Sequence, residues 1–393
     1  MTIQNLIPEA YFGREQALVK HYVLEKYLEK LTAILAVNRR TDFEFTYIDC
    51  FAGPWQADTT QMHSTSIAIS LKVLEKCKRT IESNGGRAVI RALFVEESDD
   101  TYPYLEKYLS ENTPAGISTH SIHGEFAASR QKILDWVGPQ GYAFFFIDPK
   151  GWTEVKVNTL APLLVRSRSE FVINFMYDFI NRTVSMDRYA ADMEELLGEQ
   201  IPLEILESNR ELSILNTYRK NLKQQVPNKQ VSYPVRSAYV RILDPHKERT
   251  KYHLVYLTTH PKGVIKFMET YEGADVLQGE VRAQIRDNKK LQKTGTVDLF
   301  AEYDPFVDDS ALRANEPLVD KFWLDYIGTE CSVDEAGFAD ILEKTNWFPG
   351  ELQASLSRLI LRKKIQNLDA PKLRPKKPLH FETKGGERLR VLS

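Results

Sequence analysis

The alternation of apolar runs with helix-like segments between residues 43 and 180 most constrains the fold of this chain. The runs FEFTYI, VIRALFV, YAFFFI and EFVINFMYDFINR are rich in β-branched and aromatic residues and are read as strands, the last with a polar end. Segments with helical spacing separate them. Near-continuous apolar strands such as AFFFI and FVINF are typical of a sheet buried on both faces. We therefore predict an α/β fold with a Rossmann-like, doubly wound, mostly parallel sheet.

The length of 393 residues exceeds one ordinary core and predicts two or three domains. We place a first domain at 1–300, with its core at about 15–260 and a helical insertion at about 183–230. Three helices and a basic pair of extended segments, LRPKKPLHFE and RLRVLS, follow at 310–393. That layout indicates a winged helix-turn-helix domain, a module that binds nucleic acid.

Ligands of such sheets bind beyond the carboxyl ends of the strands, so the residues just after each strand are candidates for a cofactor site. The first strand ends at Asp49, followed by a turn that contains Phe51, Ala52 and Gly53. A small-residue turn lets the backbone approach a cofactor, and the acid can position an amino group. Class I methyltransferases need this arrangement for the methionine end of S-adenosylmethionine.

Acids also follow the second and third strands. Glu96, or as second choice Glu97, can accept both hydroxyls of an adenosine ribose. Glu125 can reach an adenine amino group, and Phe126 can cover the ring. Each turn alone has a purely structural reading, but four successive strands that end in a turn and an acid favour a nucleotide-like cofactor site.

The fourth strand ends at Asp148 and Pro149, where a methyl group would be delivered. The carboxylate can accept a hydrogen bond, or a proton, from a target amine. Trp152 can stack on a target base. These three residues are the predicted catalytic group.

Other polar residues are more ambiguous. Lys20 and His21 lie on a predicted helix at 15–37, where they either contact a phosphate or, as the simpler interpretation, belong to a solvated face. Asn174 and the group Asp178, Asn181 and Arg182 follow the fifth strand and either line the substrate side or complete a turn. The eight histidines and three cysteines show no metal-ligand spacing, so no metal site is expected.

Charge is uneven along the chain although the net charge is only −2. Residues 358–393 hold eleven Lys or Arg and three acids. This excess can attract phosphates, or can form a solubilising end. The predicted nucleic-acid-binding residues are Arg362, Lys363, Lys364, Arg374, Lys376 and Lys377. No apolar run is long enough for a membrane span, and scattered cysteines suit a reducing compartment, so we expect a cytoplasmic protein.

The segments KHYVLEKYL, YIDCFAGPW, LFVEE, FFFIDPKGW and EFVINFMYDFINR, in this order, resemble the three-Cys-motif partner protein (TcmP) family over most of residues 11–270. The resemblance implies a class I methyltransferase-like fold, S-adenosylmethionine as cofactor, and a companion protein of radical-SAM or phage type. Trp55 and Lys150 depart from the pattern of related sequences.

Two functions therefore stay open. One is an S-adenosylmethionine-dependent methyltransferase that acts on DNA or RNA. The other is a non-catalytic, methyltransferase-like protein that binds nucleic acid and recruits the three-Cys-motif partner. A nuclease or a small-molecule methyltransferase is a weaker third reading.

Overall fold

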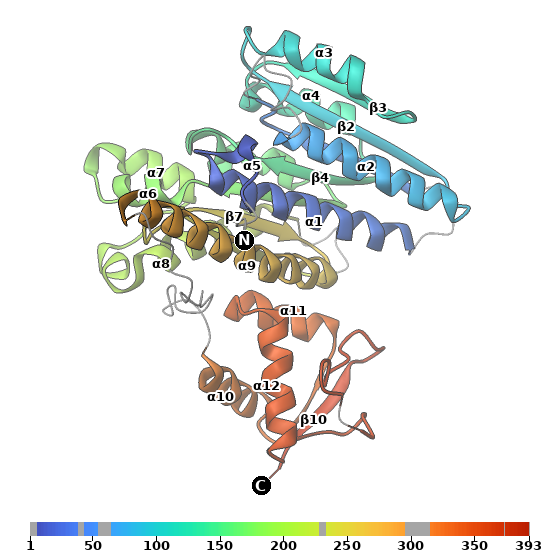
Figure 1. The fold of residues 1–393 in the computed structure, drawn as a ribbon, viewed down its shortest axis with the longest axis vertical. Helices are drawn as coiled ribbons and strands as arrows, with labels where there is room; N and C mark the ends of the chain where they lie inside the picture. The colour runs from blue at the N-terminus through green and yellow to red at the C-terminus, as the bar shows by residue number, and fades with distance from the viewer. Residues whose placement is uncertain are drawn as a thin grey trace. The chain divides into compact units, whose positions relative to one another are not determined.

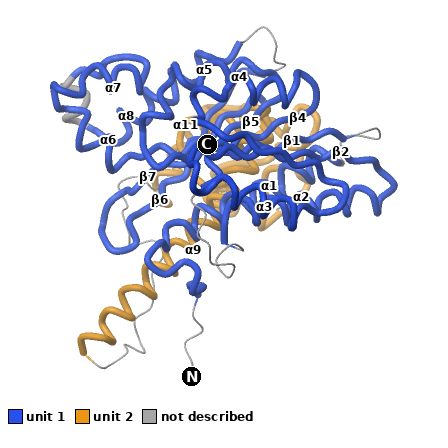
Figure 2. The backbone as a smooth tube through the Cα atoms, turned by 90° about the horizontal axis from the view of Figure 1, so that it is seen from above, with its two compact units in different colours: residues 1–259 blue, residues 260–393 orange. Residues whose placement is uncertain are grey.

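The protein is described here by a computed structural model that covers residues 6–37, 43–53, 64–227, 233–294, 315–372 and 374–392. The chain divides into two compact units, Met1–Thr259 and His260–Ser393, which Figure 2 distinguishes by colour. The domain boundary predicted between 300 and 310 falls outside the described residues, so it stays a prediction.

Unit 1 is built on a seven-stranded sheet with the order β3-β2-β1-β4-β5-β7-β6. The strands are β1 (Phe43–Asp49), β2 (Ala88–Glu96), β3 (Ile117–His123), β4 (Tyr142–Ile147), β5 (Ser169–Phe175), β6 (Arg236–Leu243) and β7 (Thr250–Thr258). All run in one direction except β7, which is antiparallel to both of its neighbours. The predicted α/β class with a mostly parallel sheet is confirmed, and the strand order is consistent with a Rossmann-like methyltransferase fold.

Helices cover both faces of this sheet (Figure 1). They are α1 (Glu15–Val37), α2 (Ser66–Ser83), α3 (Tyr102–Asn112), α4 (Phe126–Val137), α5 (Val157–Leu164), α6 (Tyr177–Thr183), α7 (Ala190–Leu197) and α8 (Leu203–Gln225), with the short 3-10 turns η1 (Glu9–Tyr11), η3 (Thr153–Val155) and η4 (Asp187–Tyr189). Helices α4, α5, α6, α7 and α8 share one continuous apolar cluster with one face of the sheet. Helices α1 and α2 pack together on the other face. The predicted insertion at 183–230 corresponds to η4, α7 and α8.

The long first helix is fixed to the sheet by its apolar stripe and by a buried polar contact. Val23, Leu24 and Tyr27 are buried, as expected for one face of a helix with a period of 3.6 residues. The Tyr27 hydroxyl donates to Oε2 of Glu170 on β5 at 2.6 Å. Because both groups are buried, this bond satisfies polar atoms that would otherwise be costly.

Two local expectations need correction. The segment after FVINF was expected to continue as a strand, but Tyr177–Thr183 forms α6. A helix was expected only around GVIKFMETYEG, but α9 runs over Pro261–Thr294 and includes the described part of the mixed, charged segment that follows.

Unit 2 contains α9, three shorter helices and a small antiparallel sheet of order β8-β10-β9. The shorter elements are α10 (Glu316–Ile327), β8 (Glu330–Val333), α11 (Glu335–Thr345), α12 (Pro349–Leu361), β9 (Ile365–Asn367) and β10 (Glu387–Val391). The fully buried Trp323 donates to the carbonyl of Leu352 at 3.1 Å, which ties α10 to α12. β8 was not expected, and β9 lies before the segment LRPKKPLHFE that was read as extended.

None of the helices within the described ranges is long and apolar enough to cross a membrane.

Candidate functional site

The parallel strands bring several of the predicted residues to one edge of the sheet. Asp49, the last residue of β1, is in register with Phe94 on β2 and Phe146 on β4. Glu96 ends β2, and Asp148 directly follows β4. Because neighbouring parallel strands end at the same edge, the three carboxylates lie along the carboxyl edge of β2, β1 and β4.

Asp49 is the most buried of these acids, with no exposed surface. Ser66 donates to its Oδ2 at 2.6 Å, and the backbone N–H of Phe51 donates to its Oδ1 at 3.2 Å. Burial, together with the negative charge of Asp148, raises the pKa of Asp49 to about 6, although the hydrogen bonds from Ser66 and Phe51 oppose this shift. An ammonium group brought to this carboxylate would therefore find a poorly solvated acceptor.

The turn after β1 is shaped by the contact between Gly53 and Glu96. A Cβ atom at Gly53 would come within 1.9 Å of Oε2 of Glu96, so the carboxylate lies directly against the glycine backbone. Oε1 of Glu96 accepts the backbone N–H of Ser98 at 2.9 Å, and the buried Ala52 donates its N–H to the carbonyl of Val95 at 2.8 Å. A residue with a Cβ atom at position 53 would displace the Glu96 carboxylate, so the glycine is what allows this contact.

Aromatic and acidic side chains extend this edge toward β3. Phe51 and Phe126 are in contact, with ring centroids 4.9 Å apart. Glu125 precedes α4 without capping it through its side chain, and Glu97 is exposed. Burial, and then the charges of Glu125 and Glu97, raise the pKa of Glu154. Glu154 therefore joins this acidic group, and neither its position nor its spacing marked it in the sequence.

Asp148 is held from two sides. The Lys20 ammonium on α1 forms an ion pair with its Oδ2, and Nδ2 of Asn174 on β5 donates to its Oδ1 at 2.7 Å. Lys20 was read as part of a solvated helix face, yet only 14% of its side chain is exposed. Lys20 precedes the buried Val23, Leu24 and Tyr27 by three, four and seven residues, so it lies on the same helix face. A cation on a buried face needs an acidic partner, and this spacing could have indicated one.

Trp152, predicted to stack on a base, is only 7% exposed and lies in the apolar cluster. Its indole stacks with the ring of Phe179 on α6, with centroids 6.1 Å apart. Phe179 is 40% exposed. The aromatic surface open to a ligand here is therefore that of Phe179, while Pro149 is buried.

Two of the polar residues after β5 bond mainly to arginines from later parts of unit 1. Arg249 donates to Asp178 at 2.7 Å, and Arg210 donates to the side chain of Asn181 at 2.6 Å. Arg182 lies 3.7 Å from Asp178. Only Asn174 of this predicted set contacts Asp148.

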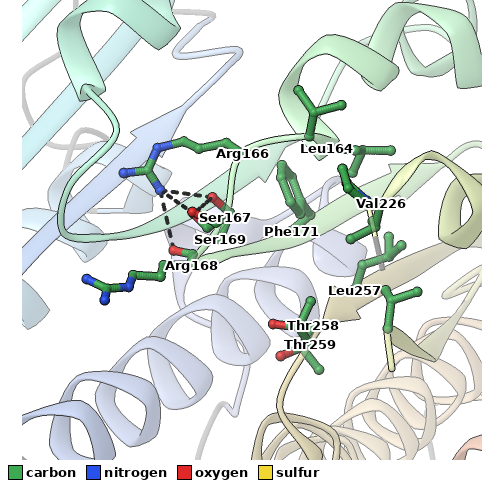
Figure 3. A pocket seen from close by; sticks show the side chains of 13 residues that line it. Leu164, Arg166, Ser167, Arg168, Ser169, Phe171, Val226, Leu257, Thr258 and Thr259 are labelled. Atoms are coloured by element: carbon green, nitrogen blue, oxygen red, sulfur yellow. Dashed lines mark hydrogen bonds between the residues drawn. The ribbon is translucent and has the colours of Figure 1, made fainter. Parts of the chain in front are cut away.

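Two cavities in unit 1 can be placed by their lining residues. The first, shown in Figure 3, has a volume of about 20 Å³ and lies at the amino end of β5, between Arg166–Ser169 and Thr258. It is too small for a nucleoside. The second, about 670 Å³, lies between α1 and α2, and its lining includes Glu29, which is paired with Lys76 at 2.8 Å.

The basic end of unit 2 separates into paired arginines and unpaired lysines. All five arginines from residue 358 onward form ion pairs, namely Arg358 with Asp320, Arg362 with Asp320, Arg374 with Glu387, Arg388 with Asp369 and Arg390 with Glu330. The six lysines of the same stretch are exposed and form no ion pair within the part of the chain that the structure describes, namely Lys363, Lys364, Lys372, Lys376, Lys377 and Lys384. Positive charge available to a partner is thus carried by lysine.

Trp55 lies outside the described residues. Within the described ranges, no three His, Cys, Asp or Glu side chains are grouped so as to hold a metal ion.

No family model and no curated protein matches this chain. Among solved structures, the protein LPL1258 from Legionella pneumophila, of the family DUF519, is 13% identical over 64% of this chain and 92% of its own, with a TM-score of 0.34. A loganic acid methyltransferase solved with SAH is 8% identical over 74% of this chain and 93% of its own, with a TM-score of 0.29. TM-scores of this size assign no function.

Proposed function

We propose that this protein is a TcmP-like, S-adenosylmethionine-dependent methyltransferase that acts on nucleic acid. The observation that carries the proposal is the contact between Glu96 and Gly53, beside the buried Asp49, at the carboxyl edge of a Rossmann-like sheet. Because Gly53 has no side chain, the Glu96 carboxylate can lie against the turn after β1, beside Asp49. Two carboxylate acceptors at this turn suit a ligand with a ribose and an amino group.

The residues have distinct roles in this proposal. Asp49 binds the amino group of the cofactor, Glu96 accepts the ribose hydroxyls, and Phe51 and Phe126 cover the adenine. S-adenosylmethionine supplies a methyl group that is already activated. The protein therefore has to align the target, and Asp148 is the carboxylate placed to orient it.

The nucleic-acid part of the proposal rests on unit 2. Three helices, α10 to α12, are followed by the antiparallel strands β9 and β10, with β8 added to their edge. We assign this arrangement as a winged helix-turn-helix, with the β9–β10 connection as its wing. Four of the six unpaired lysines lie on that connection, which suits contact with a phosphate backbone.

The direct test is calorimetric titration of the full chain with S-adenosylhomocysteine. Binding with one site per chain is expected, and the double variant Asp49→Ala and Glu96→Ala should lose it while keeping the thermal unfolding of a folded protein. A well-folded wild-type sample that shows no binding would remove the enzymatic proposal.

A second candidate is the non-catalytic partner that recruits a three-Cys-motif protein. The complete burial of Asp49 favours it, because the carboxylate is already bonded to Ser66 and Phe51. Co-purification with the companion protein, unchanged by Asp49→Ala, is the expected result for this alternative.

A further inference from the structure

Asn174 carries a buried oxygen that no described group satisfies. The residue is 4% exposed, and its Oδ1 has no hydrogen-bond partner among the residues that the structure describes. The other end of the amide is engaged, because Nδ2 donates to Oδ1 of Asp148 at 2.7 Å. Buried polar atoms without a partner are rare, because each loses its hydrogen bonds to water without replacement.

The orientation of this amide follows from its neighbour. Turning the amide by half a rotation would place its oxygen against the Asp148 carboxylate, so that two acceptors would face each other. The observed orientation is the one that pairs a donor with an acceptor. The unsatisfied atom is therefore an acceptor, and the missing partner is a hydrogen-bond donor.

Asp148 offers further acceptor capacity beside it. Each carboxylate oxygen has room for more than one hydrogen bond. Lys20 bonds to Oδ2 and Asn174 bonds to Oδ1, so each oxygen can accept a further bond. Lys20 also balances the negative charge, so the Lys20–Asp148 pair is neutral as a whole. A second cation would meet the ammonium of Lys20, whereas an uncharged donor would not.

We propose that Asp148 and Asn174 together bind an uncharged NH₂ group, with Lys20 as the residue that positions Asp148. Two adjacent acceptors match the two N–H bonds of such a group, while a hydroxyl supplies only one. Aliphatic amines are protonated at neutral pH. The class of target is therefore an amino group conjugated to an aromatic ring or a carbonyl, such as the exocyclic amine of a nucleobase.

This inference rests on the proposed function, in which Asp148 faces the target. It is tested by affinity rather than by turnover, with S-adenosylhomocysteine present. The probe is a short oligothymidylate with one central adenine, and its partner carries unsubstituted purine at that position. Thymine has no amino group, so the two strands differ only in the NH₂ group under test.

We expect the wild-type protein to bind the adenine strand about tenfold more tightly than the purine strand. Asn174→Leu and Lys20→Met should each remove most of this preference, and Lys20→Arg should restore it because the charge returns. Thermal unfolding of each variant controls for loss of the fold. Should Asn174→Leu not fold, Lys20→Met and Lys20→Arg still test the preference for adenine, because Lys20 lies on α1 and not on β5.

Equal affinities of the wild-type protein for the two strands, or no binding of either, overturn the inference. So does a preference that survives Asn174→Leu and Lys20→Met. Binding of S-adenosylhomocysteine is measured separately, so its absence counts against the proposed function, while the adenine–purine comparison without cofactor still decides the role of Asn174.

Discussion

The carboxylate of Glu96 lies against the backbone of Gly53, so closely that a Cβ atom there would come within 1.9 Å of Oε2. Gly53 does not have a positive φ angle, so alanine adds no backbone strain at this position. The far end of the Glu96 side chain can move aside, which keeps the stability cost small. The contact therefore determines the position of the Glu96 carboxylate and contributes little to the stability of the protein.

Gly53→Ala should accordingly weaken S-adenosylhomocysteine binding by at least about tenfold, or ~1.4 kcal/mol, with little change in thermal unfolding. Calorimetric titration measures the affinity. Gly151→Ala is the matched control, because a Cβ atom at Gly151 meets nothing within 4 Å. Equal affinities of the two variants would show that the contact between Gly53 and Glu96 does not contribute to cofactor binding.

Asp49 predicts a pH-dependent stability. Its pKa is raised to about 6 in the folded protein, against about 3.9 in an unfolded chain. Between these values the folded state binds the proton more tightly, so the free energy of unfolding falls as pH rises. The effect is on the order of 3 kcal/mol across the window.

Asp49→Asn removes this dependence because the amide does not ionise. The variant should gain stability relative to the wild-type protein between pH 4 and pH 7, as measured by urea unfolding at both values. A constant difference between the two proteins across that range contradicts the raised pKa.

The paired arginines and unpaired lysines of unit 2 predict how nucleic acid binds. Lys376→Glu with Lys377→Glu should weaken binding to duplexes of unrelated sequence alike and should lower the salt dependence. Fluorescence anisotropy at several salt concentrations measures both. Lys321→Glu with Lys344→Glu makes the same charge change elsewhere in unit 2, and an equal loss of affinity there would exclude a specific role for the β9–β10 connection.

Much of the sheet could be predicted because each strand carries its own signal. The run AFFFI is apolar throughout, and β4 is buried between β1 and β5. By the same logic, acids just after the strands had to share an edge, which holds for Asp49, Glu96 and Asp148.

The partners of those acids could not be predicted, because they come from distant parts of the chain. Lys20 meets Asp148 only when α1 packs on the sheet, and the residues are 128 positions apart. Trp152 illustrates the same limit, because its burial depends on α6, a helix that the sequence pattern did not separate from the preceding strand. Pairing of the arginines in unit 2 likewise depends on tertiary contacts rather than on local charge.

Glu387 predicts an acid-sensitive connection between β9 and β10. It is buried and accepts from Arg374 at 2.6 Å, from the backbone N–H of His380 at 2.7 Å and from Asn367 at 2.9 Å. Burial alone would raise the pKa of Glu387, but these hydrogen bonds outweigh it and lower the pKa. Its contribution to stability is therefore complete above the unfolded pKa and is lost as pH falls through the folded one.

Glu387→Gln keeps the size of the side chain and removes the charge, so it should destabilise unit 2 by about 1.5–3 kcal/mol at pH 7, the range for hydrogen bonds to a charged group. The loss should shrink at low pH, where the wild-type carboxylate is itself protonated. Hydrogen exchange of the His380 amide, compared at pH 4 and pH 7 after correction for the intrinsic rate, reports the opening of this connection directly. Glu382→Gln, an exposed acid of the same loop, serves as the control. Equal protection of that amide in the wild-type protein and Glu387→Gln would show that Glu387 does not hold the lysines of the loop in place.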